Sequence, residues 1–186
     1  MEMKPSLPKL SWRDRLYLLS LAKLFTIEGS TADTKITEGQ LHIFGSIIIR
    51  RHNRVQIICS TQYGKSLWVA LAAIILTCIF GKVVVVVAPS KEKAKIIMRY
   101  YIEHLGDNPL FFMKLEKNSR LERLRQEENK ERIMLNNGGG IFVVSTDEKN
   151  SRKSLEAAMG QGAEIVIGAE FCLVSDNTEA TIFRMI

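Results

Sequence analysis

The chain has 186 residues, enough for one domain with a substantial core, or for one domain and a small arm. Its formal net charge of +6 is compatible with nucleic acid as a partner. Three cysteines without a Cys-x-x-Cys pair argue against a zinc site or a disulfide framework and favour a reducing, intracellular compartment. The longest apolar run, residues 67–80, is shorter than the roughly 20 residues that cross a bilayer, so no membrane association is expected.

Residues 11–25 predict an amphipathic helix that begins at Ser11, a residue type suited to an N-cap. Its apolar side is expected to consist of Trp12, Leu16, Leu19, Ala22 and Leu24. Residues 28–35 are polar and indicate a linker. We therefore expect a helical arm with its linker over residues 1–33 and a main domain over residues 34–186.

A second helix is expected over residues 37–51, and a brief β-rich strand over Val55 to Cys59. The apolar positions of that helix would be Leu41, Phe44, Ile47 and Ile48. A turn at Gly64-Lys65-Ser66 then leads into a predicted helix over residues 66–80.

Residues 83–88 are five valines and an alanine, an unalternating run that predicts a strand buried on both faces. After Pro89, Ser90 is expected to cap a helix over residues 91–105. The charged stretch 114–132 predicts a solvated, salt-bridged helix, with a DNA-facing surface as the alternative. Further strands are expected at residues 141–144 and 164–168. Strands alternating with helices predict an α/β fold with a largely parallel sheet.

Gly64-Lys65-Ser66 carries the strongest chemical signal, because it lies between a predicted strand and a predicted helix. A turn at a helix N-terminus directs several backbone N–H groups and the positive end of the helix dipole at one spot, which favours phosphate. Lys65 would reach the β- and γ-phosphates of ATP, and the Ser66 hydroxyl would bind Mg²⁺. The match is partial, because the full pattern has a glycine where Cys59 stands.

The residues that precede Gly64 extend the expected nucleotide site. The loop residues expected to contact the nucleotide are Ser60, Thr61, Gln62 and Tyr63. Upstream, the Gln40 amide offers a donor and an acceptor that suit an adenine edge. Read alone, however, Gln40 is better explained as a surface residue of a helix.

The second half of a nucleotide site requires an apolar strand that ends in a carboxylate. The strand predicted at residues 164–168 is followed by Ala169 and Glu170. Glu170 could polarise the attacking water as a general base, whereas Ala169 has no oxygen to offer to the Mg²⁺ shell. Asp176 is a second candidate acid, although a turn or a helix cap explains it better.

From about Thr37 to Ile186 the chain resembles the ATPase domain of a tailed-phage terminase large subunit, the motor that packages DNA into proheads. Residues 37–44 are similar to the adenine-recognition segment, and residues 62–66 to a phosphate loop that also lacks the first glycine. Residues 87–90 with Ala94 resemble the segment after the second strand. Residues 160–167 and onward to 183–186 resemble the Walker B region and the helix behind it.

The resemblance implies a three-layer P-loop core of the ASCE or RecA-like type, which binds ATP and Mg²⁺. Lys65 and Glu170 would be its catalytic residues, and Ser66 its metal ligand. The implied partners are double-stranded DNA, the portal and the small terminase subunit. The family works as a homo-oligomeric ring in the host cell cytoplasm, where a neighbouring subunit could supply a catalytic arginine.

The chain departs from the family at three points. Thr61 stands where the family often has arginine, and Ala169 stands where it has aspartate. The coupling motif, further strands and nuclease of the family are also missing, so we expect a sheet without a central strand. This favours a fragment, a split gene product or a truncated form with weak hydrolysis. Two alternatives stay open: a helicase-like ATPase, and a non-enzymatic nucleotide- or DNA-binding module that assembles with a missing half.

Overall fold

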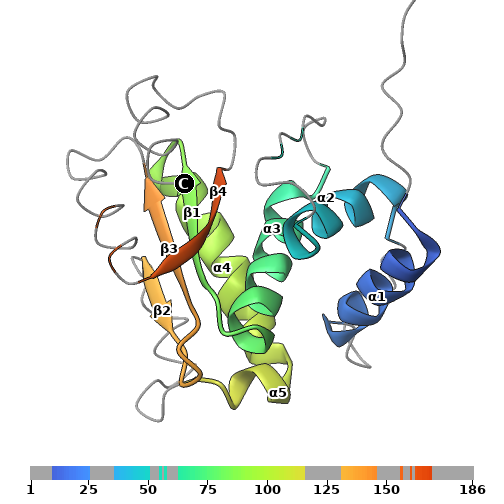
Figure 1. The fold of residues 1–186 in the computed structure, drawn as a ribbon. Helices are drawn as coiled ribbons and strands as arrows, with labels where there is room; N and C mark the ends of the chain where they lie inside the picture. The colour runs from blue at the N-terminus through green and yellow to red at the C-terminus, as the bar shows by residue number, and fades with distance from the viewer. Residues whose placement is uncertain are drawn as a thin grey trace, which may run out of the picture.

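The structure is a computed structural model that describes residues 10–25, 36–50, 55, 57, 63–115, 131–145, 156, 160 and 162–168. Its helical elements are α1 (Trp12–Ala22), η1 (Lys23–Phe25), α2 (Glu38–Ile48), α3 (Lys65–Ile74), η2 (Ile75–Ile79), α4 (Lys91–Asp107) and α5 (Pro109–Phe112). Its strands are β1 (Val83–Ala88), β2 (Arg132–Met134), β3 (Gly140–Ser145) and β4 (Ala163–Gly168). Figure 1 shows α1, α2 and α3 beside the sheet and α4 against it.

The strands form a sheet in the order β2-β3-β1-β4, in which β1 pairs in parallel with both β3 and β4. The short strand β2 runs antiparallel to β3 and makes the sheet mixed. Every residue of β1 is buried, as the valine run predicts. The chain is thus an α/β protein with a mainly parallel sheet.

Alternate residues of β1 belong to the two faces of the sheet. Val84 and Val86 join the large core that contains buried side chains of α1, α2, α3 and α4. Val83, Val85 and Val87 form a second cluster with Phe142 and Val144 of β3. The described helices therefore cover one face of the sheet, and the predicted third layer is not among the described residues.

Helix α1 begins at Ser11 as predicted, because the Ser11 side chain accepts a hydrogen bond from the Asp14 backbone N–H. The apolar side predicted for it is confirmed at Ala22 and, partly buried, at Leu19 and Leu24, and it is wrong at Trp12 and Leu16. Trp12 and Leu16 are 71% and 60% exposed, whereas Leu18 and Ala22 are buried. The reason lies in α2, where Gly45 has no side chain and lets Leu18 approach the helix backbone closely.

Helix α2 buries Leu41, Phe44 and Ile48 as predicted, while Ile47 is only partly buried. The strand predicted directly after this helix, Val55 to Cys59, lies mostly outside the described residues. Val55 and Ile57 are described, and neither is in a strand.

The helix predicted over residues 66–80 is α3 followed by η2, a π-helical turn. Asn137, in the turn before β3, donates from Nδ2 to the carbonyl oxygens of Thr77 (2.9 Å) and Cys78 (3.0 Å). This side chain satisfies carbonyls that the helix end leaves unpaired. No helix of the described part of the chain is long and apolar enough to cross a membrane.

The helix predicted over residues 114–132 is wrong at its described ends. Leu115 forms a bridge with Leu135, and Arg132 begins β2. The cause is burial: Ile133 is 3% exposed and pairs with Ile141 of β3. The rest of that stretch lies outside the described residues. By contrast, β3, β4 and the Ser90-capped α4 lie where the sequence predicts them.

Candidate functional site

Gly64 forms the turn that starts α3. Its backbone has φ 78° and ψ 18°, the left-handed conformation that glycine adopts without strain. As the N-cap it accepts a hydrogen bond at its carbonyl from the Trp68 backbone N–H, at 3.0 Å. It offers no side-chain cap, unlike Ser11, Thr37 and Ser90 at the starts of α1, α2 and α4. The first N–H groups of α3 are therefore presented to a ligand without a competing side-chain acceptor at the N-cap.

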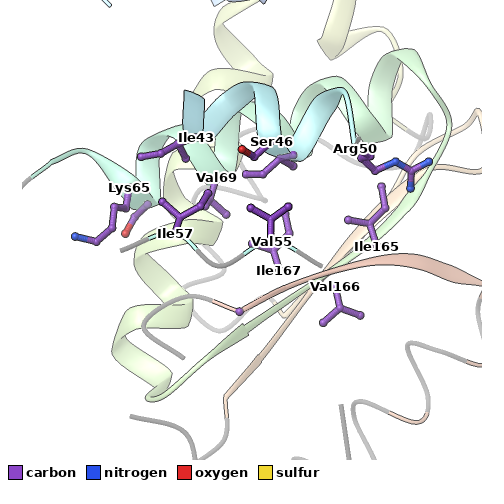
Figure 2. Close-up of a pocket in the computed structure, with 13 residues that line it drawn as sticks. Ile43, Ser46, Arg50, Val55, Ile57, Lys65, Val69, Ile165, Val166 and Ile167 are labelled. Carbon is purple, nitrogen blue, oxygen red and sulfur yellow. The ribbon is translucent and has the colours of Figure 1, made fainter. Parts of the chain in front are cut away.

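Lys65 and Ser66 are the first two residues of α3, and both are partly buried. They line one end of a groove of about 240 Å³ between α2, α3 and β4 (Figure 2). Arg50 lies at the other end of the row of side chains drawn there. The groove's lining residues are Ile43, Ser46, Ile47, Arg50, Val55, Ile57, Lys65, Ser66, Val69 and 165–168. Its walls are mainly aliphatic. Its polar groups include the cations of Arg50 and Lys65 and the hydroxyls of Ser46 and Ser66.

Strand β4 brings its carboxyl end to the same groove. Gly168, its last residue, lines the groove together with Lys65 and Ser66. In sheets with parallel strands, ligands bind in the crevice beyond the carboxyl ends of the strands, near helix N-termini. The first residues of α3 and the last residue of β4 thus line the same groove, while Glu170 lies outside the described residues.

Arg50 has φ 48°, the only positive φ of a non-glycine residue in the described part of the chain. It directly follows Ile49, the C-cap of α2, at the position that helices most often fill with glycine. The left-handed backbone turns the chain out of α2, and the Arg50 side chain lines the groove.

Gln40 lies next to the turn but is not among the residues that line the groove. Its Oε1 accepts a hydrogen bond from the Thr37 backbone N–H at 3.0 Å, which completes a capping box at the start of α2. Its Nε2 donates to the Tyr63 carbonyl oxygen at 3.3 Å. Both ends of the amide expected to read adenine therefore make contacts within the protein.

Tyr63 packs on the first turn of α2. An ideal Cβ built on Gly39 would lie 3.0 Å from the Tyr63 Cζ and closer still to the hydroxyl oxygen. The hydroxyl also lies 3.3 Å from the Thr37 Oγ1, within hydrogen-bonding distance. The ring predicted to contact the nucleotide is thus in contact with α2.

The other predicted site residues, Ser60, Thr61, Gln62 and Glu170, lie outside the described residues, and the same holds for Ala169 and Asp176. No cluster of three or more His, Cys, Asp or Glu side chains that could hold a metal ion occurs among the residues that the structure describes.

Sequence reasoning missed two groove residues, Ile43 of α2 and Arg50 just after α2, and the roles of Thr37 and Gly39. A signal was present for Thr37, since Thr-x-x-Gln is the pattern of a capping box. No local pattern could have shown that Gly39 faces Tyr63, because the two residues meet only in the fold.

Comparisons were made with family models, curated proteins and solved structures, and none of the three gives a match to this chain.

Proposed function

We propose that this chain binds ATP at the N-terminus of α3, as the nucleotide-binding part of a P-loop ATPase. One observation carries the proposal: the left-handed Gly64 turn presents an N-terminus without a side-chain cap, Lys65 and Ser66 beside the carboxyl end of β4. Backbone N–H groups, an ammonium and a hydroxyl at one helix start make a donor set that fits a polyphosphate with a magnesium ion.

Each residue of the turn has a distinct task in this proposal. The N–H groups of the first turn of α3 bind phosphate oxygens, and the Lys65 ammonium neutralises charge on the outer phosphates. The Ser66 hydroxyl would hold Mg²⁺, which would supply charge neutralisation across the phosphates. Glu170, two residues beyond the end of β4 in the sequence, would orient the attacking water and accept its proton.

We further propose that the domain of residues 34–186 serves as a motor on double-stranded DNA, as its resemblance to a terminase large subunit implies. A three-layer core, a ring of copies, the portal and small terminase subunit as partners, and the host cytoplasm belong to the same proposal. The basic net charge of +6 supports a nucleic-acid partner.

The test is titration of the protein with fluorescent ATP and Mg²⁺, followed by an ATPase assay with and without duplex DNA. Lys65→Ala is the informative variant, and Lys91→Ala is its matched control, because Lys91 is also the first residue of a helix. We expect Lys65→Ala to weaken binding at least tenfold, about 1.4 kcal/mol, and Lys91→Ala to leave it unchanged. Equal affinities of the two variants would refute the site.

A second candidate function, a nucleotide-binding module without turnover, is favoured by Ala169, because alanine cannot take part in the Mg²⁺ shell. Binding without hydrolysis supports this module. If Ala169→Asp then raises the hydrolysis rate, the motor chemistry is present and limited at this position. Unwinding of a duplex would instead favour the helicase-like alternative.

A further inference from the structure

The loop that carries Gly64 is held by the start of α2, more than twenty residues away in the sequence. Two side-chain contacts connect the two segments, and a third hydrogen bond, within the start of α2, belongs to the capping box. The Gln40 Nε2 donates to the Tyr63 carbonyl (3.3 Å), the Gln40 Oε1 accepts from the Thr37 N–H (3.0 Å), and the Thr37 Oγ1 lies 3.3 Å from the Tyr63 hydroxyl. A single glutamine thus completes its own helix cap and binds the backbone of the loop.

The hydrogen bond to the Tyr63 carbonyl acts on the peptide unit that leads into the turn. A peptide unit is planar and trans, so its C=O and its N–H point in opposite directions. The N–H of the Tyr63–Gly64 peptide belongs to Gly64. Because Gln40 holds the carbonyl of that peptide, it also sets the direction in which the Gly64 N–H points.

Gly39 explains why this arrangement has little freedom. Glycine has a lower helix propensity than alanine, so a glycine within a helix calls for a packing reason. Here the Tyr63 ring occupies the space of the missing side chain, so even the Cβ of an alanine would collide with it. Glycine at position 39 allows the ring to lie against the helix and Tyr63 to reach Thr37.

Helix α2 is itself fixed at two further points. The Arg15 guanidinium of α1 makes an ion pair with Glu38, with the Nη1 2.9 Å from the Oε1. Farther along, the rings of Phe44 and Trp68 pack edge to face, with centroids 5.4 Å apart, and join α2 to α3. Helix α2 thus contacts α1 and α3 as well as the residues that precede α3.

We propose that Thr37, Gly39, Gln40 and Tyr63 form a clasp that positions the phosphate-binding turn, so that Gln40 acts on phosphate affinity through the Tyr63 carbonyl. This inference rests on the proposed function. It assigns Gln40 as a positioning residue for the phosphates, whereas the sequence pattern assigns it to the adenine base. The two roles differ in one measurable respect, since only the positioning role affects a ligand that has no base.

The experiment measures the affinity of wild type and Gln40→Ala for ATP and for tripolyphosphate, which has the phosphates alone, by isothermal titration calorimetry. We expect Gln40→Ala to lower the affinity for both ligands by a similar factor of about five to ten. This factor corresponds to the loss of roughly one hydrogen bond. Gly39→Ala, which displaces the Tyr63 ring, should weaken both ligands in the same way. Loss of ATP affinity with unchanged tripolyphosphate affinity would overturn the clasp and support base recognition.

Ser90→Ala is the matched control, because it removes the side-chain cap of α4 and leaves the clasp intact. Its melting temperature should fall as that of Gln40→Ala does, while its affinity for tripolyphosphate stays at the wild-type value. If Ser90→Ala also lowers the affinity for tripolyphosphate, the effect is general destabilisation and the clasp is refuted.

Lys65→Ala separates the two proposals. Wild-type affinity in that variant refutes the phosphate site itself. Weak binding by Lys65→Ala, together with wild-type binding by Gln40→Ala, refutes the clasp alone.

Discussion

Replacement of Gly64 by alanine tests whether the left-handed turn is required for phosphate binding or only for folding. Gly64 has φ 78°, and a Cβ there would meet its nearest atom, the Gln40 Nε2, at 3.5 Å, an ordinary contact. The substitution therefore adds backbone strain without a steric clash. A left-handed alanine costs about 1–2 kcal/mol, and reduced freedom of the unfolded chain returns roughly 0.4–1 kcal/mol. A net loss of about 1 kcal/mol should lower the melting temperature by roughly 2–4 °C.

Gly138 provides the matched control for this variant. It has φ 83°, and a Cβ at this position would have no atom within 4 Å. Gly138→Ala should therefore lower the melting temperature by about as much as Gly64→Ala does. Thermal unfolding followed by circular dichroism, with fluorescent ATP titration of both folded variants, separates the two effects. Only Gly64→Ala should weaken ATP binding, by at least about tenfold, because relief of its strain would rotate the peptides that we propose face the phosphates. Equal ATP affinity in both variants would show that the turn has no part in binding.

Two further predictions concern the core away from the groove. The buried Thr77 and Tyr101 hydroxyls are 2.7 Å apart, and the Thr77 hydroxyl also donates to the Ile74 carbonyl at 3.2 Å. Thr77→Val should cost about 1–3 kcal/mol because it leaves the Tyr101 hydroxyl unpaired, and Tyr101→Phe only about 1 kcal/mol. In urea unfolding, the double variant should lose less free energy of unfolding than the two single variants lose together. A loss equal to that sum would contradict the pairing. Burial lowers the pKa of His104, and the nearby charges of Asp107 and Glu103 oppose this shift only in part. As the pH falls, the imidazole is therefore protonated in the unfolded chain at a higher pH than in the folded protein. Stability should therefore decrease from about pH 7 to pH 5, less steeply in His104→Gln, and equal slopes in thermal melts would contradict this burial effect.

The elements that the sequence predicts well are those decided by local chemistry. The valine run of β1 identifies a strand buried on both faces, because no other element suits five consecutive valines between turns. Ser90 predicts the start of α4 because its side chain caps the helix without help from distant residues. The Gly64 turn belongs to the same class, since its backbone conformation is one that glycine adopts freely.

The elements that the sequence does not predict depend on partners far along the chain. The π-helical turn η2 is bound by Asn137, which lies about sixty residues after it. The burial of Leu18 in α1 depends on Gly45 of α2, whose missing side chain admits it, and the apolar pattern of α1 alone does not show this. Strand β2 forms because Ile133 is buried and pairs with Ile141 of β3. In each case, tertiary packing overrides local propensity.

Gln40 shows how the same limit affects the interpretation of a site. An amide side chain has two N–H donors and two acceptor lone pairs, and the sequence alone treats all four as available to a base. The fold uses one donor on the Tyr63 carbonyl and one lone pair on the Thr37 N–H. A base could bind Gln40 only in an orientation that preserves these two hydrogen bonds, because otherwise it would release the loop that we propose holds the phosphates. In the proposed site, base recognition by Gln40 and the position of the phosphate-binding turn would therefore be coupled by the same side chain.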